Sequence, residues 1–402
     1  MTLALMVRKS LRQHLLSTVI TACSIALAGG LLMAVWVVKD QSQSAFTGVN
    51  AGFDAVLGAR GSKLQLVLNT IFHLEESPGN IPFSDFEQIR TNGAVRVAIP
   101  VALGDNYLGY RIVGTSTNLF TEVEHAPGRR FDLASGRSFE PGLREAVVGS
   151  FAAGRLGLRV GDRFQPYHGL LFDPKNRHDE TYVVVGILRP SNTPADRVIW
   201  IPLQGVQFMA GHDPKSSGDV SGVLIKFKDT SPLTARQLDL IYNKQGNRLT
   251  FAWPIAQIVA QLFNKIAWVD RVLALVAYLV AVVATGSILV SIYNSMKERR
   301  RDLAILRALG ARRGTLFAAV MLEAVAIATL GMIAAFAVHV AILSSVAAIV
   351  RAQTGVVLDP FLAHPVMVGA PLGMIALAAL AGLLPAWKAY RTPVAENLAP
   401  LS

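Results

Sequence analysis

The sequence predicts an α-helical membrane protein with four transmembrane helices and a large α+β domain inserted between the first two of them. Hydrophobic residues make up 52% of the 402 residues and charged residues only 16%, whereas soluble domains usually contain about 25% charged residues. The apolar residues are gathered into four long runs. Between the first and second run lie more than 200 residues in which no stretch is long and apolar enough to cross a bilayer.

The first run is residues 15–38, and it follows a basic flank at residues 1–14. As a helix it extends about 36 Å, enough for a hydrocarbon core of about 30 Å. Ile20–Cys23 resembles a bacterial lipoprotein cleavage box, so a cleaved signal peptide is the alternative. The apolar region of a signal peptide is only about 7–15 residues long. We therefore expect an uncleaved transmembrane helix with its N-terminus in the cytoplasm.

Residues 39–254 are predicted to form a water-exposed α+β domain, because Pro and Gly occur throughout the segment and charges of both signs are spread evenly along it. Short helices are expected at residues 82–91 and 236–244. Alternating or branched apolar runs predict strands at residues 95–101, 107–114, 145–148, 182–188, 198–201 and 223–227. A division of the domain into two halves is expected at about Gly142.

A long helix is expected at residues 255–294. Its first part is a stalk outside the bilayer, because Asn264, Lys265, Asp270 and Arg271 are hard to bury, and the rest is the second transmembrane helix. The segments that follow are a cytoplasmic helix at 295–314, a third span at 315–350, a short periplasmic loop at 351–365, a fourth span at 366–387 and a cytoplasmic tail at 388–402. The positive-inside rule places the basic flanks in the cytoplasm and the large domain in the periplasm.

The net charge of +11 is explained by this topology, because much of it lies in short basic flanks beside the apolar runs. A nucleic-acid footprint is therefore not expected. Cys23 is the single cysteine, which excludes an intrachain disulfide and a cysteine-based zinc site.

The cytoplasmic segment at 295–314 has more sequence features than a topology signal requires. It contains seven cationic residues: Lys297, Arg299, Arg300, Arg301, Arg307, Arg312 and Arg313. Glu298 is one of only two acidic residues among them. Apolar residues at helical spacing, including Leu303, Leu306 and Leu309, give a helix one narrow apolar edge, and Gly310 is suited to end it. A plain topology signal is the alternative; we interpret the segment as a helix that docks on a cytoplasmic partner. Leu306 and Leu309 are the predicted anchors, and Arg307 is the predicted ion-pair donor.

No nucleotide-binding or catalytic motif is present. Gly58–Lys63 is the only near match to a phosphate loop, and it lacks the G-x-x-x-x-G-K-[ST] spacing. We therefore expect no catalytic residue and no directly bound cofactor, with ATP and Mg²⁺ held by a partner. Five histidines of the large domain, His73, His125, His168, His178 and His212, are interpreted as surface or core residues and not as a metal site.

Two ionisable residues lie within the predicted third span, where they are rare and usually face the interior of a helix bundle. Glu323 and His339 are about 24 Å apart along a helix and cannot pair within one chain. For Glu323 we favour a structural ion pair with Arg312 or Arg313 over a proton relay. Gly29, Gly30 and Gly331 are interpreted as points of close helix packing.

In this layout, four groups of residues resemble the permease subunits of the MacB/FtsX-like family of ABC transporters, the type VII or mechanotransmission group. They are Glu298–Ala311 with Leu322–Ala324, Arg144–Gly149 with Leu156–Asp162, Val183–Leu188 with Asp196–Pro202, and Pro385–Val394. The stretch Gly58–Asn69 has no counterpart that we can place in better-known members. The resemblance implies a non-catalytic subunit of a bacterial inner membrane transporter. Its implied partners are two copies of a cytoplasmic ABC ATPase, a second permease copy or close relative, the lipid bilayer, and a periplasmic adaptor or lipoprotein.

Three functions compete at this point. In the first, a permease converts ATP hydrolysis by the ATPase into motion of its periplasmic domain and drives efflux or extrusion of an amphipathic substrate or a lipoprotein. In the second, a signalling scaffold of the FtsX type activates a periplasmic partner without transport. In the third, the chain is a membrane-bound enzyme, which the lack of a catalytic constellation argues against. The size of the large domain favours the first.

Overall fold

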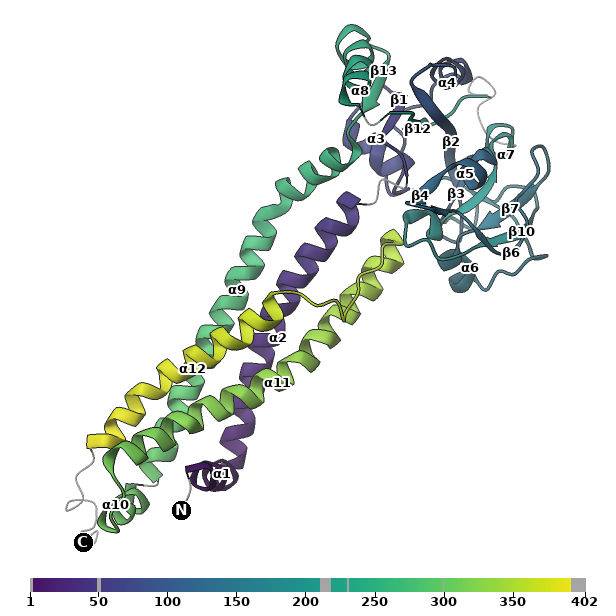
Figure 1. The fold of residues 1–402 in the computed structure, drawn as a ribbon. Helices are drawn as coiled ribbons and strands as arrows, with labels where there is room; N and C mark the ends of the chain where they lie inside the picture. The colour runs from purple at the N-terminus through teal and green to yellow at the C-terminus, as the bar shows by residue number, and fades with distance from the viewer. Residues whose placement is uncertain (1–2, 49–51, 210–217, 230, 299, 392–402) are drawn as a thin grey trace. The chain divides into compact units, whose positions relative to one another are not determined.

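The computed structural model describes residues 3–48, 52–209, 218–229, 231–298 and 300–391 (Figure 1). These residues fall into two compact units. The first, the helical unit, comprises Met1–Gln41, Ile266–Ala348 and Asp359–Ser402. The second, the sheet unit, comprises Ser42–Lys265 and Ile349–Leu358.

Six helices account for the helical unit and its continuations. They are α1 (Leu3–Gln13), α2 (Leu15–Gly48), α9 (Ile255–Glu298), α10 (Arg300–Ala308), α11 (Arg313–Thr354) and α12 (Val366–Arg391). Helices α2, α9, α11 and α12 are long and apolar enough to cross a membrane. The predicted four transmembrane helices, with a mixed α/β domain between the first and second, are thereby confirmed.

Several helix bounds differ from the sequence-based expectation. The basic flank at residues 1–14 forms the amphipathic helix α1, in which Val7 is buried while Arg8 and Lys9 are exposed. The cytoplasmic helix predicted at 295–314 is shorter, because α9 continues through Glu298 and a turn separates α10 from α11. Helix α11 likewise continues to Thr354, which shortens the loop expected at 351–365.

Small residues dominate the core of the helical unit. Its buried cluster draws alanines from α9, α11 and α12, together with Ile25 and Met33 of α2. Lipid is as apolar as leucine, so transmembrane helices associate through close van der Waals packing, which small residues permit. The helices of this unit therefore pack through small side chains, while many larger ones, such as Leu275 and Val283 on α9, remain exposed.

The three predicted glycine packing points are confirmed at the contact between α2 and α11. A Cβ added to Gly331 would lie 2.7 Å from the Cβ of Ile25 and 2.9 Å from the carbonyl oxygen of Ala22. A Cβ on Gly29 would lie 2.6 Å from Sδ of Met332, and one on Gly30 would lie 2.6 Å from Cγ1 of Val338. A side chain at Gly331 would clash with the backbone of the opposite helix, whereas one at Gly29 would first displace the flexible side chain of Met332.

One eleven-stranded sheet organises the sheet unit. Its order is β13 (Leu249–Ala252), β1 (Ala55–Ala59), β12 (Gly222–Phe227), β2 (Val95–Tyr107), β3 (Tyr110–Thr115), β11 (Ile199–Pro202), β7 (Glu145–Val148), β10 (Tyr182–Leu188) and β6 (Leu133–Gly136). Off this path, β8 (Arg163–Phe164) pairs with β10 and β9 (Tyr167–His168) pairs with β2. A separate hairpin joins β4 (Glu124–Ala126) to β5 (Arg129–Arg130).

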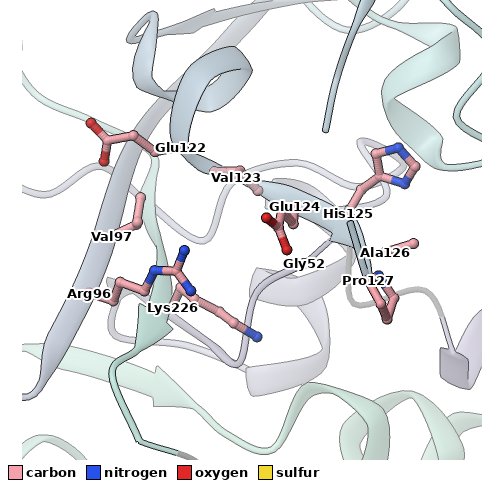
Figure 2. A pocket seen from close by; sticks show the side chains of 10 residues that line it. All are labelled: Gly52, Arg96, Val97, Glu122, Val123, Glu124, His125, Ala126, Pro127 and Lys226. Carbon is pink, nitrogen blue, oxygen red and sulfur yellow. The ribbon is translucent and has the colours of Figure 1, made fainter. Parts of the chain in front are cut away.

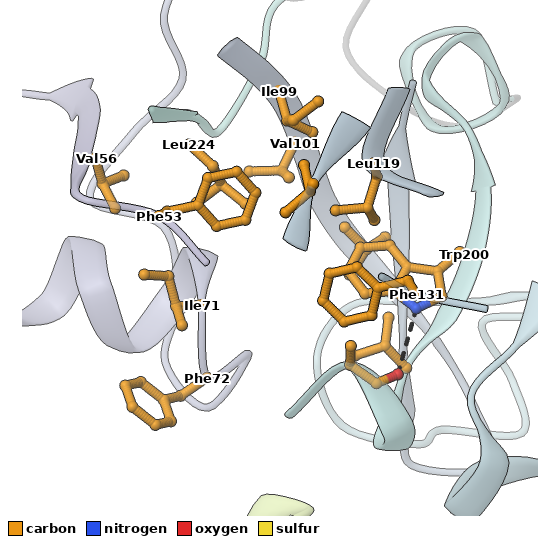
Figure 3. Packing of buried hydrophobic residues seen from close by; sticks show 14 of the residues in the cluster. Phe53, Val56, Ile71, Phe72, Ile99, Val101, Leu119, Phe131, Trp200 and Leu224 are labelled. Atoms are coloured by element: carbon orange, nitrogen blue, oxygen red, sulfur yellow. Dashed lines mark hydrogen bonds between the residues drawn. The ribbon is translucent and has the colours of Figure 1, made fainter. Parts of the chain in front are cut away.

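Both faces of this sheet are buried. Along each strand, neighbouring side chains point to opposite faces. One face carries Val56, Ile99, Val113, Val147 and Trp200, which share a single cluster (Figure 3). The opposite face is covered in two parts. Ala55, Leu57, Val223 and Ile225 join one cluster, whereas Ile112, Ala146, Ile199 and Ile201 join another. The strands therefore read as continuous apolar runs rather than as a clean alternation.

Short helices cover these faces. They are α3 (Lys63–Thr70), α4 (Phe83–Arg90), α5 (Asn118–Glu122), α6 (Ser150–Leu156), α7 (Leu203–Gln207) and α8 (Pro232–Asp239), and a π-helical turn (Leu240–Gln245) follows α8. The helix expected at 82–91 is confirmed as α4, and the one expected at 236–244 is divided between α8 and the π-helical turn. The six predicted strands are all present, with β2 continuing to Tyr107.

The stretch Gly58–Asn69, which had no counterpart in the resemblance, forms the end of β1 and most of α3. Gly58 and Gly222 are direct partners on adjacent strands. A Cβ on Gly58 would lie 2.4 Å from Cδ1 of Leu66, and one on Gly222 would lie 2.8 Å from Cγ2 of Thr70. This pair of glycines lets α3 lie directly on the sheet, and the stretch has a structural explanation.

The sheet does not divide at Gly142. Strand β7 lies after Gly142 and β6 before it, yet both belong to the same end of the sheet. That end continues into the rest of the sheet because β11 pairs in parallel with β3. The expected boundary between two halves is therefore wrong, since backbone pairing runs across it.

Candidate coupling site

Helix α10 ends in a hydrogen-bonded reversal built on Gly310. The amide of Gly310 donates to the carbonyl of Arg307 (3.0 Å), and the amide of Ala311 donates to the carbonyl of Leu306 (3.0 Å). This pair of bonds is a Schellman cap, which places a left-handed residue directly after the helix. Gly310 has φ of 95°. The predicted end of the helix at Gly310 is confirmed.

An apolar edge runs along α10. Ile305 and Leu309 are four residues apart, so they share one face of the helix, and their exposed fractions are 41% and 80%. Leu306 is half-buried and Ala304 is buried. The most exposed apolar pair is thus Ile305 with Leu309, and Ile305 was not among the predicted anchors.

Positive charge surrounds this edge. Lys297, Arg301, Arg312 and Arg313 are exposed, whereas Arg307 is half-buried. Arg299 lies outside the described residues, and for Arg300 and Leu303 the structure describes the helical backbone alone. Glu298, at the end of α9, lies 3.2 Å from Nδ1 of His14 through Oε2. Its side chain is 67% exposed, so this contact contributes little to stability.

Aromatic rings and cations connect α9, α11 and α12 beside α10. Nζ of Lys388 donates to the hydroxyl of Tyr293 (2.8 Å) and lies 4.6 Å from the centre of its ring. The guanidinium of Arg313 lies 5.8 Å from the centre of the Tyr390 ring. Sequence reasoning assigned Lys388 only to topology. The sequence signal that could have predicted these contacts is the presence of tyrosines close to basic residues, a pairing typical of membrane interfaces.

The two intramembrane ionisable residues are buried in α11. Glu323 accepts a hydrogen bond from the hydroxyl of Ser10, which α1 provides. The ion pair of Glu323 with Arg312 or Arg313 remains a prediction. His339 is fully buried, and neither ring nitrogen has a hydrogen-bond partner within the described ranges. The structure does not bring Glu323 and His339 together with the apolar edge of α10.

A family model for the C-terminal domain of FtsX-like permeases matches residues 274–394. This segment contains most of α9 and the whole of α10, α11 and α12. Residues 274–394 therefore resemble the FtsX-like permease family. Such permeases are in general the non-catalytic transmembrane subunits of ABC transporters, and family membership implies an ABC ATPase partner.

Solved structures resemble part of this chain. The extracellular domain of the noncanonic ABC-type transporter YknZ from Gram-positive bacteria matches with a TM-score of 0.31 and 13% identity, over 49% of this chain and 99% of that one. The periplasmic region of MacB from Actinobacillus actinomycetemcomitans matches with a TM-score of 0.36 and 11% identity, over 54% of this chain and 94% of that one. No curated protein matches the sequence.

The sheet unit has a pocket of about 400 Å³ (Figure 2). Its lining residues are Gly52, Arg96, Val97, Glu122, Val123, Glu124, His125, Ala126, Pro127 and Lys226. Arg96 comes from β2 and Lys226 from β12, and Glu124 begins the hairpin β4–β5. Nζ of Lys226 lies 3.0 Å from Oδ1 of Asp54. The pocket is lined by charges of both signs, and it belongs to a different unit from the coupling helix.

The histidines of the sheet unit have three different environments. His73 is buried, and burial, with smaller contributions from Arg111 and Arg197, lowers its pKa to about 3. Burial likewise lowers the pKa of His125. His168 and His178 meet at Asp105, although sequence reasoning separated them. His212 lies outside the described residues. His168 is a surface residue and His178 a core residue, as expected, but they are not scattered in space; the expectation that they form no metal site stays a prediction.

We expect the stability of the sheet unit to fall on acidification because of His73. Its ordinary pKa is 6.5 and its folded pKa is about 3, so between these values the unfolded chain binds a proton that the folded chain excludes. Stability lost through one such group is at most about 1.4 kcal/mol per pH unit. His73 has φ of 55°, which asparagine tolerates. His73→Asn should therefore reduce the pH dependence of the stability of the sheet unit.

Hydrogen exchange of peptides from β11 in the purified full-length chain measures this effect, because Trp200 of β11 lies against the His73 ring with 5.6 Å between ring centres. His125→Asn is the matched control and should remove a smaller part of the dependence, since His125 is less deeply buried. If the stability of the His73→Asn variant depends on pH as that of the wild type does, His73 is not the cause of the acid sensitivity.

Proposed function

We propose that this chain is the permease subunit of an ABC transporter. It converts ATP binding and hydrolysis by a separate ATPase into motion of its large domain, and this motion drives efflux or extrusion of an amphipathic substrate or a lipoprotein. The single observation that supports the proposal most is α10. It lies between two candidate membrane spans, inside the segment that matches FtsX-like permeases, and it exposes an apolar edge among arginines.

The exposed edge supports docking rather than topology alone. A topology signal needs only positive charge, whereas Leu309 at 80% exposure is left in water without any packing gain. Protein interfaces concentrate their energy in a few apolar anchors ringed by weaker polar contacts. The pairing of Ile305 and Leu309 with nearby arginines has that composition, and an acidic-rimmed groove on an ATPase is the surface that fits it.

The same charges support an orientation. With the basic residues of α1, α10 and the end of α12 on the cytoplasmic side, the N- and C-termini are cytoplasmic and the sheet unit is periplasmic. In the proposed assembly the chain lies in the inner membrane of a bacterium. Two ATPase copies and a second permease copy or close relative complete the assembly, and a periplasmic adaptor or lipoprotein is a further candidate partner.

The alternative is a signalling scaffold of the FtsX type, which would use the same coupling helix to activate a periplasmic partner without moving a substrate. The size of the sheet unit, whose sheet alone has eleven strands, favours the transporter. Purification from the native membrane with identification of co-purified molecules separates the two. A bound lipid or amphipathic molecule supports transport, and a cell-wall hydrolase supports signalling.

The chain purified alone is expected to hydrolyse no ATP, because its sequence lacks the phosphate-loop spacing at Gly58–Lys63. Activity should appear only when the ATPase subunit is added. A phosphate-release assay on the isolated chain, with the reconstituted pair as the positive control, measures this. Turnover by the isolated chain that survives further purification would contradict the proposed division of labour.

A further inference from the structure

Two histidines and an aspartate that are distant in sequence meet at one edge of the sheet unit. Asp105 lies near the end of β2 and is the direct partner of His168 in β9. The segment that carries His178 pairs back on β9: the amide of His168 donates to the carbonyl of Asn176 (2.7 Å), and the amide of His178 donates to the carbonyl of Pro166 (2.9 Å). Residues 166–178 thus form a hairpin whose two ends each carry a histidine beside Asp105.

The distances among these side chains suit a shared ion. Oδ1 of Asp105 lies 3.2 Å from Nε2 of His178 and 3.5 Å from Nδ1 of His168. Each residue has a ligand atom within 4.8 Å of those of the other two. In a tetrahedral zinc site with bonds of about 2.0–2.1 Å, neighbouring ligand atoms are about 3.3 Å apart. Two of the three separations already match this value, and a small rotation of the exposed His168 ring shortens the third.

The burial of this cluster favours a cation. Asp105 is completely buried and His178 is 7% exposed. Glu180 is also buried and lies two residues after His178. The pKa of the nearby Tyr182 hydroxyl is raised, first by burial, then by Glu180, and also by Asp105, against an opposing effect of Arg144. Two buried acidic groups, Glu180 and Asp105, thus lie close enough to Tyr182 to act on its pKa.

The backbone around the cluster is fixed before any ion arrives. Nδ2 of Asn106, a fully buried residue next to Asp105, donates to the carbonyls of Gly169 (2.9 Å) and Leu171 (3.1 Å). Asp173 closes the far turn of the hairpin by accepting from the amide of Lys175 (3.0 Å). A register shift between Leu103 and Asp105 re-aims the end of β2. A ligand set held this way loses little conformational freedom on binding.

We propose that Asp105, His168 and His178 bind one divalent transition-metal ion, with Zn²⁺ as the expected occupant. Two imidazole nitrogens and one carboxylate oxygen suit Zn²⁺, whereas Mg²⁺ and Ca²⁺ select oxygen ligands. The side chain of His168 is 52% exposed, so an ion can reach the cluster from solvent through this ligand. The bound ion joins the hairpin at 166–178 to β2 and slows the local opening of the hairpin.

The experiment uses the purified full-length chain after removal of any polyhistidine tag and treatment with a chelator. Isothermal titration with Zn²⁺ gives stoichiometry and affinity, and titration with Co²⁺ gives a visible absorption band that reports imidazole and carboxylate ligands. The variants are His168→Gln and His178→Gln, with His125→Gln as the matched control in the same unit. Circular dichroism of the metal-free proteins checks folding, and the exposed His168→Gln carries the test if His178→Gln does not fold.

We expect one Zn²⁺ per chain, slower hydrogen exchange in residues 169–177 when Zn²⁺ is bound, and a loss of affinity of at least about tenfold in both cluster variants. His125→Gln should bind as the wild type does. The proposal is overturned if the wild type binds no stoichiometric Zn²⁺, which would leave a hydrogen-bonded triad only. It is also overturned if His168→Gln binds Zn²⁺ as tightly as the wild type.

Discussion

Replacing Leu309 with aspartate is expected to abolish association with the ATPase and, with it, transport. The substitution places a charge where we propose that an apolar anchor enters a groove, at a cost of about 3 kcal/mol or more. Such a cost weakens binding by about 100-fold. Leu309 is preferred to Leu306 for this test because it is 80% exposed, so the aspartate does not disturb the packing of α10 itself. Co-purification and ATPase stimulation in proteoliposomes measure the effect.

The chain offers a matched control for this substitution. Leu233 in α8 is 76% exposed and belongs to the sheet unit. Leu233→Asp makes the same chemical change at similar exposure and should leave the ATPase bound. Arg307→Ala should have a smaller effect than Leu309→Asp, because charges at the rim of an interface act mainly on association rate. A Leu309→Asp variant that keeps the ATPase bound and coupled would refute the role assigned to α10.

Replacing Gly331 with valine is expected to destabilise the helical unit by at least about 1–3 kcal/mol, the usual range for overpacking. The new Cβ alone would lie 2.9 Å from the carbonyl oxygen of Ala22. That atom is backbone, so the strain cannot be relieved by a side-chain rotation, and α2 must move away from α11. The thermal midpoint of the chain in detergent, followed by a probe in the helical unit, should fall clearly.

Gly286→Val is the control for this prediction. Gly286 is also a glycine within a candidate span, α9, but a Cβ added there meets nothing within 4 Å. The two variants add the same side chain to a membrane helix and differ only in what it meets. Equal midpoints for Gly331→Val and the wild type would mean that α2 and α11 do not pack as closely as described.

Most of the fold could be predicted because the signals were local. Long apolar runs with basic flanks predicted the four spans, and a helix needs no long-range contact to satisfy its backbone in lipid. Strands such as β7, β10 and β12 were visible as branched apolar runs. Strands β1 and β13 were not predicted. In β1, Gly58 interrupts the apolar run, and its role in the close approach of α3 is visible only in the packed structure.

The candidate coupling site was predicted in part. The cationic residues and Gly310 are consecutive in sequence, so their location and the end of the helix followed from pattern alone. Which apolar residues face outward depends on how α10 packs on its own unit, and the sequence therefore favoured Leu306 while the structure exposes Ile305. The hydrogen bond between Ser10 and Glu323 joins residues more than 300 positions apart. No local sequence pattern predicts such a contact.

The cluster of Asp105, His168 and His178 could not be found from spacing. Metal-binding histidines are recognised in sequence when they share one helix or one short loop, as in H-E-x-x-H. Here, one ligand lies on a strand and two lie at the ends of a hairpin, and the register between β2 and β9 brings them together. Strand register is a long-range property that single-sequence patterns do not specify.

The reversal at Gly310 leaves little conformational freedom between α10 and α11. Only four residues separate Ala308 from Arg313, and their backbone is tied at both ends, by the two bonds of the cap and by the amide of Thr315 donating to the carbonyl of Arg312 (3.0 Å). Few dihedral angles remain free to absorb a displacement. Helix α11 is 42 residues long, about 60 Å at 1.5 Å per residue, and it contributes residues to both units. If α10 docks on an ATPase as proposed, a displacement of α10 is therefore transmitted directly to α11.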